Sequence, residues 1–267
     1  MSALFSHANS NLATEEDIRK VPVPAKTRSY CPVPNGILVD MIREKAHDVL
    51  GAKPVKEQFA LSKNNQRMFG TMTFESDSDE TGISFGFGNC YDMSIKLRFA
   101  AGAQVFICDN LCYSGDSITY ARKHTTHIFK DLEEKMLRAL WETRSSYEKT
   151  TAQLDRLKDI PCSLDEGYKL LGLARGHGII KSTAYNIALE DWSNPRVFET
   201  EVVKEGEKEI YTVTPFSEKN MYSLYNCFTE GVKKGDVGKR IERQASLHQF
   251  MMSDYVHKRA FPARMYS

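Results

Sequence analysis

The sequence contains no long hydrophobic run. Residues 1–20, MSALFSHANSNLATEEDIRK, lack the apolar core of a signal peptide, and no later stretch approaches the ~20 apolar residues that a membrane helix requires. We therefore expect a cytoplasmic protein without a membrane partner. The formal net charge is only +1, so any affinity for nucleic acid must come from a local patch of basic residues.

Cysteine is also scarce, and two common cofactor motifs are missing. Six cysteines are scattered over 267 residues, which is typical of reduced thiols in a chain large enough to fold without disulfides. No H-E-x-x-H or G-x-G-x-x-G element occurs, so the zinc-protease and dinucleotide-binding classes have no support. A content of 41% apolar and 27% charged residues excludes the disordered and fibrous classes.

Strand-like segments dominate residues 54–110. VKEQFALS and RMFGTMTFES flank residues 63–66, KNNQ, whose asparagine pair tolerates a left-handed backbone, and this pattern predicts a hairpin. ISFGFGN, IKLRFAA and AQVFICDN continue the run of β-branched and aromatic residues. Strands that follow one another closely pair mainly antiparallel. The sequence therefore predicts an α+β fold built on a mainly antiparallel sheet.

Helical patterns surround and follow the predicted sheet. Apolar residues at three-to-four spacing predict a helix from residue 37 to a C-terminal glycine, Gly51. Residues 118–160 contain neither proline nor glycine, which predicts one long helix after the sheet. Ser163 and Glu166 have the form of a capping box that begins a helical C-terminal half. Within that half, VFETEVV and EIYTVTPF predict a second hairpin.

Prolines indicate how the chain is divided. Four prolines between residues 22 and 34 each fix φ and remove a donor, so residues 1–35 are predicted to form an extended N-terminal arm. Residues 36–267 are predicted to form a single composite α+β domain, with a possible sub-boundary near residue 161.

Two cysteines and two histidines provide the donor set of a tetrahedral zinc site. These residues are Cys108, Cys112, His124 and His127. Against this interpretation, Cys108 lies in an apolar strand, where a thiol commonly packs as a small hydrophobe. We therefore expect neither a metal nor another cofactor. The glycines of GISFGFG likewise lack the lysine and following helix of a phosphate loop, and they predict a strand with close backbone contacts.

Short polar residues collect at the ends of the predicted strands. Asn89, Asp92 and Ser94 lie between two strands, and Asp109 and Asn110 end the next apolar run. Such residues usually satisfy backbone donors in turns. If they instead converge in a cleft with His124, the catalytic candidates are Asp92 and His124, because imidazole exchanges protons near neutral pH.

Basic residues form two local clusters that are candidates for nucleic-acid binding. Arg122 and Lys123 begin the predicted long helix, where they either contact phosphate oxygens or face solvent. The second cluster lies around Gly235 and Gly238 and consists of Lys233, Lys234, Lys239, Arg240 and Arg243. The aromatic residues just upstream have helix-core spacing, so we expect Tyr222, Tyr225 and Phe228 to be mostly buried rather than stacked on bases.

Several segments resemble one known family. The central part of the chain is similar to the phage- and plasmid-encoded family called domain of unknown function 932, in the segments SKNNQRMFG, GFGNCYDMSIKLRFAAGAQVFICDN, SGD and RKHT. The flanking motifs of that family are resembled by TRSYCPVP and LYNCFTEG. The resemblance spans about residues 27–231 and implies a mobile element in a bacterial host cell. It brings no settled activity. The motif positions are Asn89, Asp92, Ser94, Cys108, Asn110, Gly115, His124, Thr125, Asn226 and Thr229.

The leading hypothesis is a phage- or plasmid-encoded protein that binds single-stranded DNA in recombination or replication, as a homo-oligomer of the single-strand-annealing type. It rests on the basic clusters and on the order of a β-sheet followed by a long helix, which is similar to the core of annealing proteins. Two alternatives stay open. One is an enzyme or host-defence-countering protein that uses a polar cleft around Asn89, Asp92, Asn110 and His124, and the other is a non-catalytic interaction protein.

Overall fold

The computed structural model describes most of the chain. The described residues are 10–62, 64–78, 80–105, 110–113, 120–125, 127–204, 207–236 and 239–253. Cys108, Asp109, Gly115 and Gly238, named above, lie outside them. No helix within these ranges is long and apolar enough to cross a membrane.

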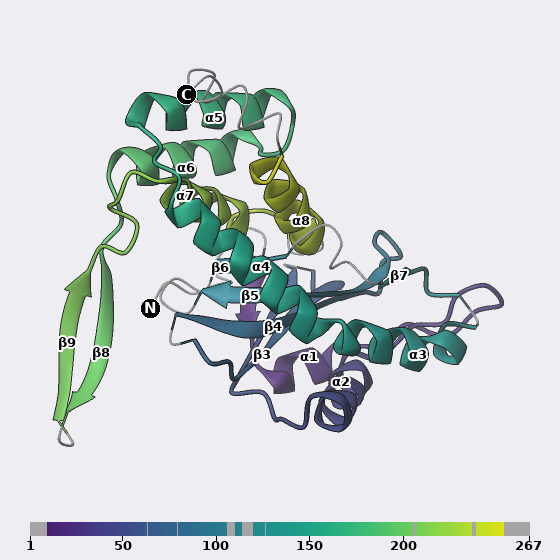
Figure 1. Ribbon diagram of the computed structural model, residues 1–267. Helices are drawn as coiled ribbons and strands as arrows, with labels where there is room; N and C mark the ends of the chain where they lie inside the picture. Colours follow the sequence, from purple (N-terminus) through teal and green to yellow (C-terminus); the bar gives the residue numbers. More distant parts are fainter. Residues whose placement is uncertain are drawn as a thin grey trace.

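The fold is α+β, as predicted, and an antiparallel sheet of seven strands forms its first half (Figure 1). The strand order is β1-β2-β3-β4-β5-β6, and β7 also pairs with β5, at the opposite end of β5 from β6. The strands are β1 (Ser10–Ala13), β2 (Lys56–Ser62), β3 (Arg67–Phe74), β4 (Thr81–Cys90), β5 (Leu97–Val105), β6 (Asn110–Cys112) and β7 (Tyr120–Arg122).

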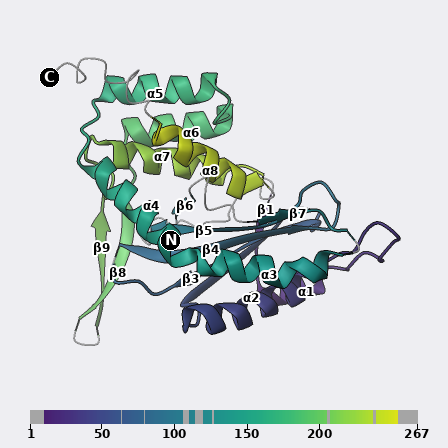
Figure 2. The same ribbon diagram turned by 45° about the vertical axis from the view of Figure 1, so that its right-hand side comes forward.

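Helices cover the sheet and build a second lobe beside it. One face is covered by α1 (Glu15–Lys20), α2 (Asn35–Leu50) and α3 (Ile128–Trp141). From there α4 (Thr143–Lys158) leads to a helical lobe, which consists of α5 (Leu164–Gly176), α6 (Ser182–Ser193), α7 (Met221–Lys233) and α8 (Arg240–Met251). Between α6 and α7, a hairpin is formed by the strands β8 (Phe198–Lys204) and β9 (Glu207–Val213) (Figures 1 and 2).

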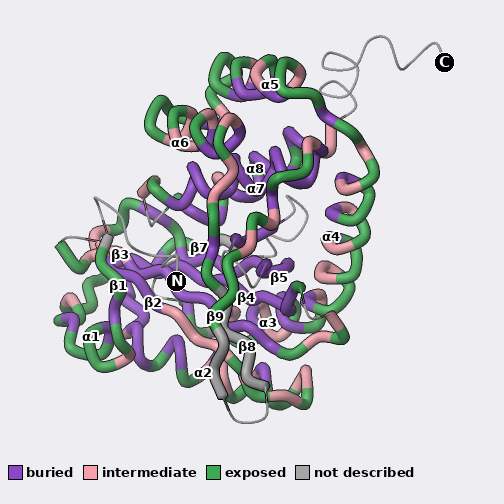
Figure 3. Tube along the Cα trace, turned by 90° about the vertical axis from the view of Figure 1, so that its left-hand side faces the viewer, coloured by how far each residue is buried: buried purple, intermediate pink, exposed green. Residues whose placement is uncertain are grey.

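The two lobes share one core. Ala103, Val105 and Cys112 of the sheet belong to the same buried apolar cluster as the side chains of α4 to α8. Every residue of α7 is buried, while the outer faces of α4 and α5 are exposed (Figure 3). The predicted burial of Tyr222, Tyr225 and Phe228 is therefore confirmed. Residue 161 lies between α4 and α5, where Pro161 forms a β-bridge with Asn220.

The prediction of one long helix is wrong in two respects. Residues 120–122 form β7, because the outer edge of β5 offers backbone partners that sequence patterns do not reveal. The helical stretch then begins at Ile128 and is divided at Glu142 into α3 and α4. At the division, the Thr143 hydroxyl donates to the carbonyl of Ala139 at 2.9 Å, a back-bond that favours bending of a helix.

The prediction of an extended arm is wrong for residues 15–20, which form a helix, whereas residues 10–13 are extended and join the sheet. β1 pairs antiparallel with β2, and α1 follows directly. The short helix begins at a capping box in which the Thr14 hydroxyl accepts from the Asp17 amide at 3.1 Å and the Asp17 carboxylate accepts from the Thr14 amide at 2.8 Å. The prolines start only at residue 22, and residues 22–34 indeed contain neither helix nor strand.

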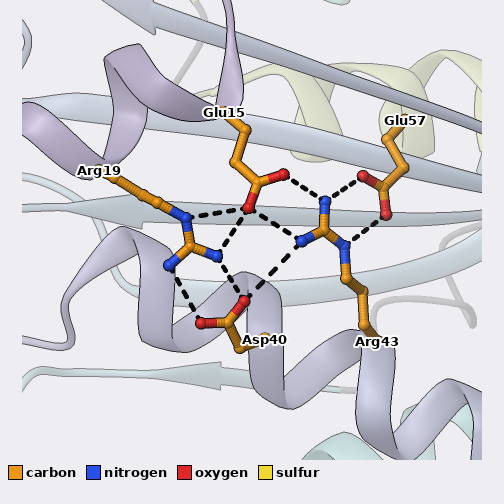
Figure 4. Close-up of polar contacts among 5 residues, drawn as sticks. All are labelled: Glu15, Arg19, Asp40, Arg43 and Glu57. Carbon is orange, nitrogen blue, oxygen red and sulfur yellow. Dashed lines mark hydrogen bonds and ion pairs between the residues drawn. The ribbon is translucent and has the colours of Figure 1, made fainter.

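A network of ion pairs fastens α1 to the body (Figure 4). Glu15 accepts from Arg19 and from Arg43, each at 2.7 Å, and Arg19 also reaches Asp40 of α2 at 2.5 Å. Arg43 in turn pairs with Glu57 of β2. Hydrogen bonds from Arg43 and Arg19 lower the pKa of Glu15 to about 2. The network therefore joins the first helix to both α2 and the sheet.

Replacing Glu15 by glutamine is expected to lower the free energy of unfolding at pH 7 by less than ~1 kcal/mol, because the pair is partly exposed and screened by water. The folded pKa of Glu15 lies below its ordinary value of 4.5, so this contribution is complete above about pH 4.5 and is lost as the pH falls through about 2. Urea unfolding across this range measures it. Glu16→Gln is the control, since Glu16 pairs with Lys20 on the exposed surface of α1 and takes no part in the network of Figure 4. Equal pH profiles for the two variants would contradict the prediction.

The glycines of β4 allow a close contact, as predicted. Tyr113 lies directly over Gly86, where a β-carbon would collide with the phenol ring, and its hydroxyl is 3.1 Å from the Ser84 hydroxyl. Residues 82–86, GISFG, also have the G-x-S-x-G form of a nucleophile elbow. That role requires a sharp turn between a strand and a helix, whereas Ser84 is buried in the middle of β4.

Candidate nucleic-acid interface

A groove of about 500 Å³ opens between the N-terminus of α6, the C-terminus of α7 and the first turns of α8. Its apolar lining includes Ile179, Ile180 and Val232. α6 and α7 can approach closely here because Gly231 has no β-carbon. A β-carbon at this position would collide with the carbonyl oxygen of Ala184. We call this feature the basic groove, since its cationic lining residues are Lys181, Lys234, Lys239 and Arg243.

The acidic residues of the basic groove are paired with arginines from the sheet. Asp236 accepts from Arg67 of β3 at 2.9 Å, and Glu242 accepts from Arg98 of β5 at 2.7 Å. By contrast, Lys181, Lys239 and Arg243 form no ion pair with any part of the chain that the structure describes. The groove therefore presents an excess of positive charge to solvent.

The N-terminus of α6 adds to this positive field. Lys181 occupies the N-cap position, and its side chain does not cap the first turn of the helix. The first amides of a helix have no partner within the helix and carry part of its dipole, so they favour a nearby anion. The N-terminus of α6 and the cations of the basic groove therefore favour the same class of ligand, an anion such as a phosphate group.

Two residues of the predicted basic cluster are buried, so the expectation that they contact phosphate is wrong. Lys233 is 1% exposed, and its ammonium group is 2.6 Å from the Glu230 carboxylate. Arg240 is also 1% exposed; it donates to the Lys233 carbonyl at 2.5 Å and lies over the Phe69 ring. Burial lowers the pKa of Arg240 to about 10. The Arg240 side chain thus links α8 to the end of α7 and to Phe69 of β3, while the Lys233 ion pair lies within α7.

The other predicted basic pair lies outside the groove. Arg122 is in β7, and Lys123 follows it as an exposed residue; neither lines the groove. Lys181, in contrast, does line the groove although the sequence did not suggest it. An isolated lysine carries no cluster signal, and only the packing of α6 against α7 brings it near Lys239. The break at residues 176–178, GHG, was the available sign that a helix begins there.

Asn89 and His124 do meet, in a buried polar contact. The distance between His124 Nε2 and Asn89 Oδ1 is 2.7 Å, and Asn89 donates to the Val33 carbonyl at 2.7 Å and to Asn35 Oδ1 at 2.8 Å. Because the amide oxygen only accepts, His124 donates from Nε2. Burial lowers the pKa of His124 to about 4, so the ring is neutral at pH 7. The contact attaches residues 33–35 to the sheet.

Asp92 has different partners. Its carboxylate accepts from the Ser94 amide at 3.0 Å and from Arg67 Nε at 3.0 Å. Burial by itself would raise the pKa of Asp92, but the hydrogen bonds from Ser94 and Arg67 outweigh it and lower the pKa below its ordinary value. Since Arg67 also binds Asp236, Asp92 is connected to the rim of the basic groove and not to His124.

Asn110 belongs to a third place in the fold. Its amide donates to Asn226 Oδ1 of α7 at 2.9 Å, and the Thr229 hydroxyl donates to the Asn226 carbonyl at 2.9 Å. Motif residues from the middle and the end of the resemblance thus pair across the two lobes. The predicted cleft of Asn89, Asp92, Asn110 and His124 is therefore not formed as one site.

The motif residue Thr125 has a local role. Its backbone carbonyl accepts a hydrogen bond from the Ile128 amide at the start of α3.

The described members of the zinc set have opposite environments. Cys112 is fully buried in the core, whereas His127 is exposed at the start of α3. Within the described ranges, no group of three His, Cys, Asp or Glu side chains is arranged to hold a metal ion.

The chain matches no family model, no curated protein and no solved structure. Its resemblance to domain of unknown function 932 therefore stays a prediction. What the protein does has to be inferred from the geometry of its own residues.

Proposed function

We propose that the protein binds single-stranded DNA through the basic groove. The observation that supports this most directly is the set of cations Lys181, Lys239 and Arg243, which form no ion pair with the described residues and lie around the N-terminus of α6. A nucleic-acid strand carries a phosphate at every nucleotide, so it can contact several of these cations at once.

The lining of the groove favours recognition of the sugar-phosphate backbone over recognition of bases. No aromatic residue is among the described residues that line it, and the nearby Tyr222, Tyr225 and Phe228 are buried. Base stacking is thus not provided, and phosphate contacts alone carry no sequence information. We expect binding with little sequence preference.

A role in phage or plasmid recombination or replication, including strand annealing, is part of the proposal. Its support is the resemblance described above together with a groove suited to a polyanion. Binding of this kind brings no reaction of its own, so the proposed protein acts on DNA by holding it.

The test is the salt dependence of single-stranded DNA binding. For the unaltered protein, the affinity should fall steeply with salt, as expected for ~3 to 4 phosphate contacts. Lys239→Glu/Arg243→Glu, called the groove variant, is expected to lose about 100-fold in affinity at low salt and to lower the slope of log K against log salt by about 2. Fluorescence anisotropy with a labelled oligonucleotide measures both.

The matched control is Arg144→Glu/Arg156→Glu, which makes the same change of charge at exposed positions of α4. It should retain nearly all of the affinity. Absence of binding by the unaltered protein, an affinity that does not change with salt, or an equal loss in control and groove variant would each overturn the proposal.

A further inference from the structure

The β8–β9 hairpin projects from the helical lobe as a separate ribbon (Figures 1 and 2). Its described strands pair only with each other, so both outer edges leave backbone groups without a strand partner. Large apolar side chains are exposed on it as well: Ile210 is 65% exposed and Val197, at its base, 60%. An isolated two-stranded ribbon is only marginally stable in water, which favours a binding partner.

The base of the hairpin is firmly anchored. Phe198 packs edge-to-face on Phe216, with ring centroids 6.1 Å apart. Just before β8, Arg196 forms ion pairs with Asp191 at 2.7 Å and with Glu230 at 3.0 Å. These contacts fix the direction in which the ribbon leaves the lobe, so the hairpin is held as an arm.

The arm and the basic groove lie at opposite ends of the α6–α7 pair. The arm connects the C-terminus of α6 to the N-terminus of α7, whereas the groove is formed at the N-terminus of α6 and the C-terminus of α7. In Figure 1 the hairpin lies on the left and α8, which contributes to the groove, lies to the right of α6 and α7. An arm with this fixed direction cannot enter the groove of its own chain.

The charges of the two surfaces are complementary. Residues 198–213 contain five glutamates and two lysines, a net charge of −3. In the strand register Glu199 lies opposite Thr212 and Glu201 opposite Ile210, and residues directly opposite each other share a face. One face therefore combines acidic positions with an exposed apolar residue. The groove offers the counterpart, an apolar lining with basic residues and an uncapped helix N-terminus.

We propose that the β8–β9 hairpin is an assembly arm that docks in the basic groove of a second copy of the chain. Arm and groove are different surfaces, so the contact is head-to-tail, and repetition of it produces a ring or an open chain of protomers. The proposal goes beyond DNA binding, although both ligands use the same groove.

The test is a charge exchange followed by sedimentation velocity at low salt over a series of protein concentrations. Glu199→Lys/Glu201→Lys is the arm variant, and Lys239→Glu/Arg243→Glu is again the groove variant. The unaltered protein should associate as its concentration rises, and each variant alone should stay monomeric. An equimolar mixture of the two variants should associate again, because each arm then meets a groove of opposite charge.

Glu134→Lys/Glu148→Lys is the matched control, with the same change of charge as the arm variant at exposed positions of α3 and α4. It should associate like the unaltered protein, and circular dichroism should show that all variants are folded. A monomeric unaltered protein, an equal loss of association in the control, or a mixture that stays monomeric would each overturn the assembly arm.

The arm variant also separates this proposal from DNA binding. It retains every lining residue of the basic groove, so its affinity for single-stranded DNA tests the groove alone. Undiminished DNA binding together with an overturned assembly test would leave only the DNA proposal. Restored association in the mixture without DNA binding by the arm variant would leave only the assembly arm.

Discussion

Replacing Lys233 by methionine is expected to lower the free energy of unfolding by about 3 kcal/mol, whereas replacing its neighbour Lys234 should change it by less than about 0.5 kcal/mol. Methionine keeps most of the length of the lysine side chain but removes the charge. Lys233 and Glu230 are 1% and 5% exposed, so the carboxylate loses a partner where water cannot replace it. Lys234 is exposed on the rim of the groove.

Urea unfolding of the two variants measures this difference directly. DNA binding should respond in the opposite way: Lys234→Met should lower the salt slope by about 1, and folded Lys233→Met should leave it unchanged. A loss for Lys233→Met as small as that for Lys234→Met would contradict the burial of Lys233 with Glu230, and a reduced slope for Lys233→Met would place its charge at the DNA.

The protein is expected to lose about 3 kcal/mol of stability through His124 as the pH falls from about 6.5 to about 4. Burial lowers the folded pKa of this imidazole from 6.5 to about 4. In that interval the unfolded chain takes up a proton that the folded chain excludes, so acid favours unfolding. The contribution is complete above pH 6.5 and is lost as the pH falls through the folded pKa.

The measurement compares unfolding free energies of the unaltered protein and of His124→Gln between pH 4 and pH 7. Carboxylates also titrate in this range, but they are common to both proteins, so the difference isolates the histidine. Glutamine retains a donor for Asn89 without taking up a proton. His127→Gln, an exposed histidine three residues away, is the control and should keep the full pH dependence. A His124→Gln profile parallel to that of the unaltered protein would contradict the assignment.

Turns and helix ends were the features that sequence reasoning located well. The predicted turn at residues 64–66 lies between β2 and β3, with Asn65 at a φ of 56°, and Gly51 ends α2 at a φ of 66°. Ser163 and Glu166 form the capping box predicted for α5, and the second hairpin was predicted as well. Each of these features depends on side chains within a few residues of one another, so its signal is contained in a short window.

Residue environments across the fold were beyond the same reasoning. Lys233 and Lys234 are neighbours in a basic run, yet one is buried and the other is at the surface. A helical stripe did contain a sign of this, because Lys233 follows the buried Asn226 and Thr229 at seven and four residues. No sequence pattern predicted that Asn110 would pair with Asn226, or that residues 120–122 would join the edge of β5.

By itself, the sequence determined the class of the fold, its hairpins and some of its helix ends, because hydrophobic period, glycine and capping residues act over short distances along the chain. The tertiary structure alone decided which charges face solvent. The basic groove exists because α6 packs against α7 and arginines of the sheet neutralise Asp236 and Glu242. Such pairings join residues far apart in sequence, and their energies depend on burial, which a local pattern does not contain.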